Sequence, residues 1–393
     1  MFRKLRGHLA LAVLAAIVFL SLPAPAHAQV VVKVNDVVNF RFGIQLQAWA
    51  DWLQDPNSEG YSQNFLIRRI RFILAGQLAK NLSIFYQTDE PRAGNAGADG
   101  NKNICSGPAT TCPNTGFETQ DAYAEWKLAG DAFMLDGGLY LVPTSRNGLT
   151  STQSFLSYDI GTWALQGNGI EKGNGGRDYG FGTKGYLVDD HLEYRFAAFD
   201  GNRNPSTPQE KPLGNAAGSR NSFRLAGRVQ YDFFDTEKGY VYPGTYRGTK
   251  NVLAIGGWGD GQGDYKAYGG DIFFDSPLVG KDALTAELDY NHFDGGTKNP
   301  TLLKQNDVFA NVGWYFDVCK VQPFFVYQKL NQTDDSKPPG DQERIGGGLN
   351  WYISGLNLKL STLYERVIPK NQPVTARTKD FNHFSIQLQA LYF

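Results

Sequence analysis

Apolar and polar side chains alternate along most of this 393-residue chain, and this pattern limits the possible folds more than any other feature. From Val38 to Ala48 every second residue is apolar, while Asn39, Arg41 and two glutamines lie between them. Because successive side chains of a β-strand point to opposite faces, a period of two predicts strands with one apolar and one polar face. The chain is 13% aromatic and has 45 glycines but only 2 methionines, which suits strands and tight turns better than helical cores.

The alternation recurs in about sixteen segments of roughly ten residues each. These segments are 38–53, 64–77, 80–89, 119–128, 131–141, 177–188, 190–199, 221–233, 250–258, 265–275, 282–293, 305–316, 320–330, 341–353, 356–367 and 379–393. The links between the first six segments are alternately long and very short, with tight turns at 80–81, 129–131 and 189–191. Residues 234–249 are an exception, because this long stretch lies where a short turn is expected.

An even number of strands, with short turns at one rim and long loops at the other, is typical of bacterial outer-membrane barrels. We therefore expect an all-β fold, a closed antiparallel transmembrane β-barrel of about sixteen strands with short periplasmic turns and long extracellular loops. Closure pairs every backbone group with a neighbouring strand, so the apolar faces can lie against outer-membrane lipid. A barrel of this size is too wide for side chains to fill, which predicts an aqueous channel for passive diffusion of small solutes.

The first 28 residues have the features of a secretory signal peptide. Three basic residues precede the apolar run Leu9–Leu22, and a small-residue cleavage site follows at 26–28. The run is shorter than the roughly 20 residues that a spanning helix needs, although a retained N-terminal anchor is the alternative. We expect residues 1–28 to be removed and residues 29–393 to form a barrel in the bacterial outer membrane.

Charge and cysteine content exclude several classes of partner. Without the three signal-peptide cations the formal net charge falls from −1 to −4, so we expect no binding of nucleic acid. Cys105 and Cys112 lie in one Gly-, Asn- and Pro-rich stretch without a nearby histidine, which favours a loop disulfide over a zinc site. Cys319 is left without a predicted role. We expect no metal and no other cofactor.

Strand parity predicts which basic residues face the channel. In the segment 64–77 the apolar face consists of Leu66, Ile70, Phe72 and Leu74. Arg69 and Arg71 then face inward, because an arginine in mid-membrane lipid would cost roughly 2–4 kcal/mol. The same rule gives the complete predicted pore-lining and anion-binding set: Arg41, Arg69, Arg71, Lys184, Arg195, Arg224, Arg228, Arg344 and Lys359. Rings of Arg and Lys line anion pores, so the set predicts a preference for anions such as phosphate.

Acidic residues also occupy inward positions, which leaves an alternative open. Glu125, Asp271, Glu287 and Asp289 have inward parity, so a mixed electric field without anion preference is compatible with the sequence. The loop 142–176 is expected to fold into the channel and constrict it, with polar side chains supplied by Arg146, Ser151, Thr152, Tyr158 and Asp159. A surface loop without pore contact is the alternative.

Catalytic motifs are scarce. The mature chain has only His191, His292 and His383, without a G-x-S-x-G or H-E-x-x-H motif, and its G-x-G-x-x-G match at 180–185 lies inside an alternating strand. We therefore do not expect an enzyme. A barrel-based outer-membrane hydrolase and a secreted glycan-binding β-sandwich are the remaining alternatives to a channel.

Several segments resemble one porin family. Residues 64–76 followed by 82–87, residues 137–143 leading to 149–151, and residues 239–246 resemble strands two and three, the entry to the third loop and the long periplasmic turn of the phosphate-selective porin O and P family. The likeness covers essentially the whole mature chain. It implies a homotrimeric outer-membrane porin for phosphate or other anions. The alternative is a general porin, or one for other small solutes such as amides or sugars, without anion preference.

Overall fold

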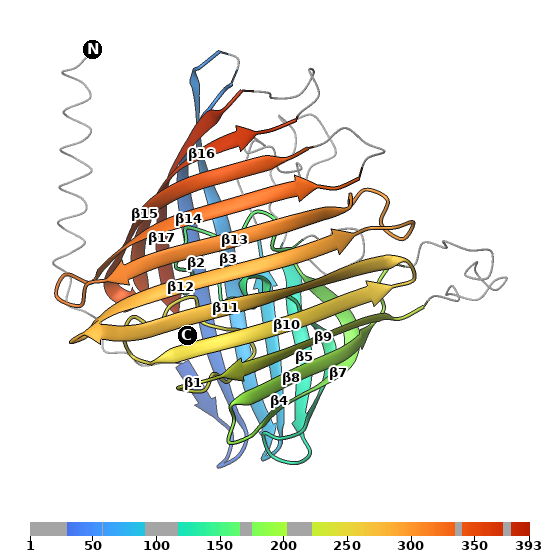
Figure 1. Ribbon diagram of the computed structural model, residues 1–393. Helices are drawn as coiled ribbons and strands as arrows, with labels where there is room; N and C mark the ends of the chain where they lie inside the picture. The colour runs from blue at the N-terminus through green and yellow to red at the C-terminus, as the bar shows by residue number, and fades with distance from the viewer. Residues whose placement is uncertain are drawn as a thin grey trace.

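The computed structural model describes residues 30–56, 58–90, 117–165, 175–202, 222–334, 340–371 and 379–393. Seventeen strands in these residues form one sheet, and β2–β17 close into an antiparallel barrel because β17 pairs with β2 (Figure 1). The predicted closed all-β barrel of about sixteen strands is therefore confirmed. The predicted signal peptide lies outside the described residues, as do Cys105 and Cys112.

The strands follow one another around the barrel in chain order. They are β1 (Val30–Lys33), β2 (Asn39–Gln54), β3 (Tyr61–Ala79), β4 (Leu82–Asp89), β5 (Glu118–Lys127), β6 (Met134–Leu141), β7 (Arg177–Leu187), β8 (Leu192–Phe199), β9 (Arg224–Asp232), β10 (Val252–Gln262), β11 (Tyr265–Val279), β12 (Asp282–Asp294), β13 (Gln305–Tyr315), β14 (Val321–Gln332), β15 (Gln342–Leu356), β16 (Leu358–Pro369) and β17 (Phe381–Tyr392). A short helix, α2 (Arg146–Leu149), lies between β6 and β7.

The links confirm the predicted division into two rims. Turns of a few residues join β3 to β4, β11 to β12 and β15 to β16 at one end of the barrel, the short-turn rim, toward the lower left of Figure 1. Longer links such as β6–β7 and β8–β9 lie at the other end, the long-loop rim. One link at the long-loop rim is short, because Gly263 and Asp264 alone join β10 to β11. Gly263 has a φ of +63°, which a two-residue hairpin favours.

The strand β1 is not predicted by the alternation. It pairs with the first residues of β2, and its Val30 lies opposite Phe42. The last residue of β17 pairs nearby, since Tyr392 lies opposite Ile44 on the same edge of β2. The strand β1 therefore continues the line of β17 at the short-turn rim.

Apolar side chains cover the outside of the barrel and polar side chains fill its inside. Phe181 is 79% exposed on the outer face and Leu225 is 63% exposed, whereas the inward Gln389 and Asp289 are fully buried. A soluble protein has the reverse distribution. The outer face therefore fits hydrocarbon, as the alternation predicts.

The prediction for Leu66 is wrong. Leu66 is buried on the inner face, because Gln47 pairs with Arg69 whereas the next residue of β2, Ala48, pairs with Ile67. The skipped residue, Arg68, forms a β-bulge. A bulge reverses the parity of the strand beyond it, so Leu66 and Arg69 can both face inward.

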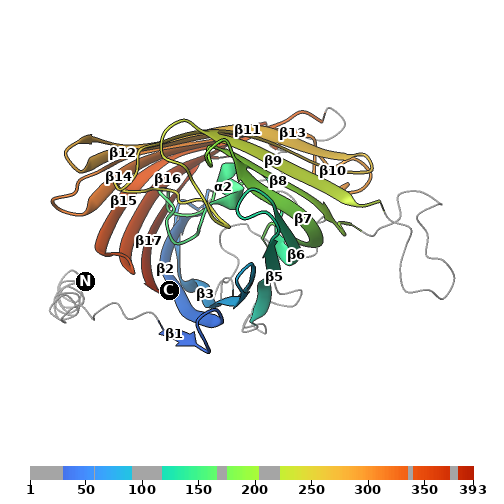
Figure 2. The same ribbon diagram turned by 90° about the horizontal axis from the view of Figure 1, so that it is seen from below.

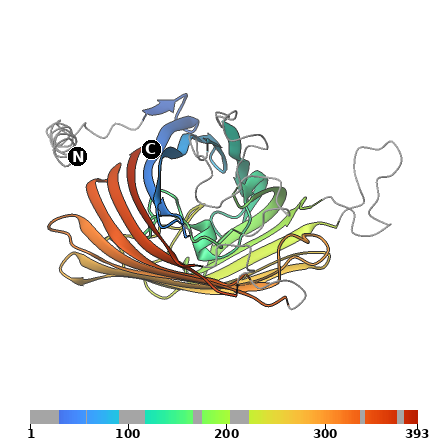
Figure 3. The same cartoon turned by 90° about the horizontal axis from the view of Figure 1, so that it is seen from above.

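Two segments occupy the inside of the barrel. Views along the barrel from below and from above both place α2 and the coil around it within the ring of strands (Figures 2 and 3). One segment is the β6–β7 loop, residues 142–176, of which 142–165, 175 and 176 are described. The other is the β9–β10 connection, residues 233–251, which contains the long stretch expected at a short-turn position.

Replacing Leu288 by Arg tests the outward parity. Leu288 lies in the middle of β12 and is 48% exposed on the outer face. An arginine at mid-membrane should lower the free energy of unfolding by roughly 2–4 kcal/mol, measured by denaturant titration in lipid bilayers. Leu288→Phe is the control, because it changes shape without adding charge. Equal stability of the Arg variant and the wild type would show that Leu288 does not face lipid.

Candidate channel and constriction

The β6–β7 loop crosses the interior and is held by backbone contacts to the barrel wall. At one end, the amide of Arg146 donates to the carboxylate of Asp271 at 3.1 Å, and that of Asn147 donates to Asp289 at 3.1 Å. At the other end, the side-chain amide of Asn350 donates to the carbonyl of Leu156 at 2.7 Å. The loop is therefore fixed between β11–β12 and β15, across the inside of the barrel.

Apolar contacts dock the same loop onto the inner wall. Leu156 and Tyr158 pack against Phe309, Phe324 and Leu363, which point inward from β13, β14 and β16. An inner wall facing only water would be polar at these positions. Inward apolar residues are thus the signal in the sequence that could have located the docking site of the loop.

The β9–β10 connection joins the loop inside the barrel. The amide of Tyr242 donates to the carbonyl of Leu149 at 3.0 Å, and the amide of Ser151 donates to the carbonyl of Tyr242 at 2.8 Å. The guanidinium of Arg146 binds both carboxylate oxygens of Glu237, at 2.6 and 2.7 Å. Burial alone would raise the pKa of Glu237, but Arg146 outweighs it and lowers the pKa below its usual value.

The joined segments cover one side of the inner wall, here called the enclosed side, formed by β8–β12. Arg224 faces inward and binds Asp260 at 2.5 Å, and Arg228 binds Asp271 at 2.5 Å. Both arginines are at most 1% exposed. Arg195 is also buried and binds Glu193 at 2.7 Å. These three predicted pore-lining residues face inward. They line neither the central cavity nor the rim cavity, which are described below.

The other side of the interior, the open side, contains a cavity of about 490 Å³ between β3–β5 and the β6–β7 loop. Arg69 and Arg71 line this central cavity, as parity predicts for inward residues, together with Arg68 and Arg177. Arg69 binds Asp159 of the loop at 2.6 Å. Arg71 binds Asp89 at 2.8 Å and Thr152 of the loop at 2.9 Å.

Sequence reasoning missed Arg68 and Arg177. Arg68 shares the parity of the lipid-facing residues, but its bulge turns it inward, where its Nε binds Asp159 at 2.8 Å. The cost of an arginine in lipid, roughly 2–4 kcal/mol, could have indicated this bulge. Arg177 is the first residue of β7, and its Nε lies 3.2 Å from the carboxylate of Asp121.

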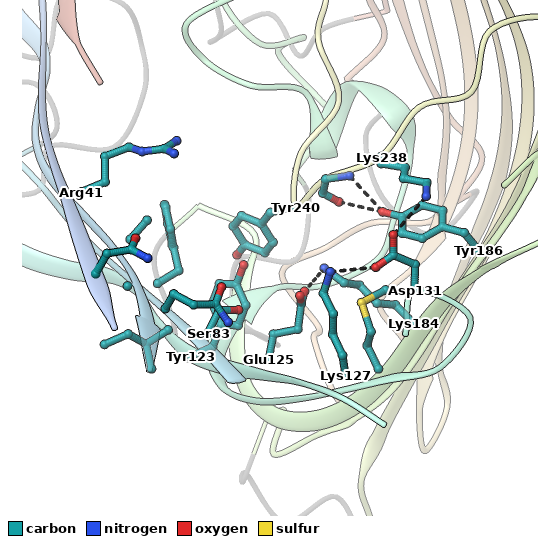
Figure 4. A pocket seen from close by; sticks show the side chains of 18 residues that line it. Arg41, Ser83, Tyr123, Glu125, Lys127, Asp131, Lys184, Tyr186, Lys238 and Tyr240 are labelled. Carbon is teal, nitrogen blue, oxygen red and sulfur yellow. Dashed lines mark hydrogen bonds and ion pairs between the residues drawn. The ribbon is translucent and has the colours of Figure 1, made fainter. Parts of the chain in front are cut away.

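A second cavity, of about 450 Å³, lies toward the short-turn rim (Figure 4). Arg41 stands on one side of it, opposite a group formed by Lys127, Asp131 and Lys238. Asp131 binds Lys127 at 2.7 Å and Lys238 at 3.0 Å, and these hydrogen bonds lower the pKa of Asp131. Lys184 also lines this rim cavity.

The rim cavity adjoins the central cavity. Phe85 and Tyr240 line both, so the two cavities are neighbours on the open side. Lys184 is paired with Glu125 in the lining of the rim cavity. Within the described residues, the barrel strands that line the two cavities are β2–β7.

The remaining predicted site residues hold the loop. The ammonium group of Lys359 lies 3.4 Å from the carbonyl of Phe155. Arg344 binds Glu365 on the barrel wall at 3.0 Å and stands 6.0 Å from the ring centroid of Trp163 in the loop. Tyr158 packs against Trp49 with ring centroids 4.6 Å apart, and burial raises the pKa of Tyr158. The structure thus brings Arg146, Ser151, Thr152, Tyr158 and Asp159 together as anchors of the β6–β7 loop inside the barrel.

The described residues hold no cluster of three or more His, Cys, Asp or Glu side chains suited to a metal ion. None of their helices is long and apolar enough to span a membrane. His191 binds the carbonyl of Asp232, while His292 stacks on Tyr268 from a different strand. Cys319 is exposed.

The comparisons with known proteins find a shared fold. No family model matches the sequence, and no curated protein matches it either. Among solved structures, OmpF of Salmonella typhi in complex with daunomycin matches with a TM-score of 0.58 and 11% identity, over 92% of this chain and 99% of that one. OprB of Pseudomonas putida matches with a TM-score of 0.59 and 9% identity, over 90% of this chain and 94% of that one.

A third solved structure is the anion-selective porin of Comamonas acidovorans. It matches with a TM-score of 0.55 and 13% identity, over 90% of this chain and 99% of that one. At these identities the likeness concerns the fold. The chain therefore has the fold of outer-membrane porins, while membership of the phosphate-selective porin O and P family stays a prediction.

Replacing Asp159 by Asn tests the anchoring of the β6–β7 loop. Burial alone would raise the pKa of Asp159, but Arg68 and Arg69 outweigh it and hold the pKa well below the usual value. The ion pairs are therefore complete above the unfolded-state pKa of about 3.9 and are lost only as the pH falls through the lower folded-state value. At neutral pH the variant should lose about 3 kcal/mol of local stability, because two guanidinium groups lose their carboxylate.

Hydrogen exchange of the backbone amides between residues 151 and 162 measures this loss. Exchange should be faster in Asp159→Asn than in the wild type at neutral pH. Asp189→Asn, at an exposed turn of the short-turn rim, is the matched control. Unchanged exchange in Asp159→Asn would show that these ion pairs do not hold the loop.

Proposed function

We propose that this chain is an outer-membrane porin that forms an aqueous channel for passive diffusion of small solutes, with a preference for anions. The observation that carries the proposal is the set of basic side chains that line the two cavities on the open side of a closed porin-type barrel. The β6–β7 loop is the proposed constriction, because it faces the arginines across the central cavity.

The charges on the two sides of the interior differ. Four guanidinium groups of the central cavity pair with three carboxylates, those of Asp89, Asp121 and Asp159. In the rim cavity Arg41, Lys127, Lys184 and Lys238 accompany the lining acids Glu125 and Asp131, and Asp190 also pairs with Lys238. A passing solute therefore meets an excess of positive charge along the described part of the open side.

Acidic residues are concentrated on the enclosed side. Four buried arginines, Arg146, Arg195, Arg224 and Arg228, lie there with the buried carboxylates of Glu193, Asp232, Glu237, Asp260, Asp271, Asp275, Glu287 and Asp289, and Asp178 of the adjoining β7 pairs with Arg224. The covering segments separate many of these acids from the cavities. Because charge interactions in salt solution act over about 8–10 Å, we expect the wall of the open side to dominate the selectivity.

The expected preference is a bias and not strict exclusion of cations. Every arginine of the central cavity has a carboxylate partner, which reduces the local field. The same pairing is the observation that favours the second candidate, a general porin for neutral solutes such as amides or sugars. Phosphate preference rests on the resemblance and on the ability of Arg to bind oxyanions with two hydrogen bonds.

The setting of the channel is part of the proposal. The apolar outer face and the signal-peptide features of residues 1–28 support insertion into the bacterial outer membrane after export. A homotrimer is proposed on the resemblance alone. The proposed role is transport and not catalysis.

Replacing Arg69 and Arg71 together by Gln tests the anion preference. In a gradient of potassium chloride, the zero-current potential of the wild type should be shifted from zero toward the Nernst potential of chloride. In the double variant this potential should move toward the Nernst potential of potassium by about 10 mV or more. The reason is that two wall charges are lost within a Debye length of the solute path. Planar-bilayer recordings measure the potential.

The double variant Lys80→Gln and Lys281→Gln is the matched control. It removes the same charge from exposed turns at the short-turn rim, and neither residue lines a cavity. Its potential should stay near that of the wild type. A cation-selective wild type whose potential is unaffected by loss of Arg69 and Arg71 would contradict the anion preference.

A further inference from the structure

The central cavity has an apolar face as well as a basic face. The apolar residues that line it are Ile73, Phe85, Leu141, Phe155, Ile160, Leu165, Val241 and Phe393. Phe85 comes from the barrel wall, Phe155 from the β6–β7 loop and Phe393 from the end of the chain. Leu141 and Val241 also pack between the loop and the β9–β10 connection. Phe85, Ile160, Leu165 and Phe393 are only partly buried, and hydrated inorganic ions would not use this apolar surface, because they keep their water shells.

Basic and apolar groups lie next to each other in this cavity. The guanidinium of Arg69 stands over the ring of Phe155, 5.9 Å from its centroid. Phe85 and Tyr240, which share the lining with Arg71 and Arg177, pack with ring centroids 5.6 Å apart. A solute in the cavity therefore meets aromatic surface and hydrogen-bond donors at the same time.

The net charge of the basic face would be balanced by a ligand with a single negative charge. Four guanidinium groups, of Arg68, Arg69, Arg71 and Arg177, pair with three carboxylates, which leaves an excess of one positive charge among the described residues. A monoanion balances this excess. Phosphate carries a second negative charge near neutral pH and offers no apolar surface, so it fits neither feature as well.

We infer that the central cavity is a transit site for monocarboxylates with a single ring, of the size of benzoate. The carboxylate accepts hydrogen bonds on the arginine face, and the ring lies against the aromatic and aliphatic side chains. A volume of about 490 Å³ accommodates one such ring with accompanying water. This inference rests on the proposed anion-preferring porin and names the class of its solute.

Block of the chloride current by added organic anions tests the inference. Benzoate, cyclohexanecarboxylate, acetate and inorganic phosphate are added in turn to one side of a bilayer that contains the wild-type channel. Benzoate and cyclohexanecarboxylate should reach half-block at a concentration about tenfold lower than acetate, because only they bury a ring in the cavity. Phosphate should block less well than benzoate.

A variant of the apolar face separates this effect from charge. Ile160→Asn with Leu165→Asn keeps all four arginines and the number of side-chain heavy atoms. It should raise the half-blocking concentration of benzoate toward that of acetate. Val188→Thr with Val318→Thr is the matched control, since both valines are exposed outside the cavities and the change should leave the block unaltered.

The outcomes distinguish the inference from the proposed function. A wild type that prefers chloride over potassium but is blocked equally by benzoate and acetate overturns the inference and leaves the anion-preferring porin standing. A benzoate block that is as strong in the Ile160 and Leu165 variant as in the wild type also overturns it. A wild type without chloride preference overturns the proposed function on which the inference rests.

Discussion

The ion pair between Arg146 and Glu237 holds together the two segments that fill the barrel. A sixteen-stranded barrel is too wide for wall side chains to close, so the position of the inner segments decides where solute can pass. Arg146 belongs to the β6–β7 loop and Glu237 to the β9–β10 connection, and both side chains are almost completely buried. A buried pair contributes little net stability, because desolvation opposes the attraction. Its effect here is geometric, since it joins the two segments over the enclosed side, while the rest of the loop crosses the interior and faces the central cavity.

The separation of charge follows from this placement. Arg224 and Arg228 are inward-facing residues of the same kind as Arg69 and Arg71, but carboxylates and the inner segments enclose them. Arg69 and Arg71 are each only 4% exposed, but they line the central cavity between the barrel wall and the β6–β7 loop. Identical side chains thus have different roles according to what covers them. The proposed anion preference depends on four arginines of the open side more than on the total number of inward cations.

Much of the fold could be predicted from the sequence, because a period of two is a direct consequence of strand geometry. It located the sixteen barrel strands and assigned Arg69, Arg71, Arg224 and Arg228 to the inner face. The period alone did not locate the bulge at Arg68, and only the cost of placing this arginine in lipid could have indicated it. It also could not show that Arg224 and Arg228 are enclosed, because parity gives the face of a side chain and not the distant segment that packs against it. The inward Phe309 and Phe324 were a local sign that the β6–β7 loop docks on β13 and β14, but not that a segment covers these arginines.

The course of the solute along the open side is the central claim, and labelling of introduced cysteines tests it most directly. In a background with Cys105, Cys112 and Cys319 replaced by Ser, one variant carries Ser83→Cys, in the rim cavity, and another carries Thr285→Cys, buried on the enclosed side. A charged methanethiosulfonate reagent is added while single-channel current is recorded. The account predicts a stepwise change in current for Ser83→Cys and none for Thr285→Cys. A change of equal size and speed at Thr285→Cys would contradict it, because solute would then reach the side that the inner segments are held to enclose.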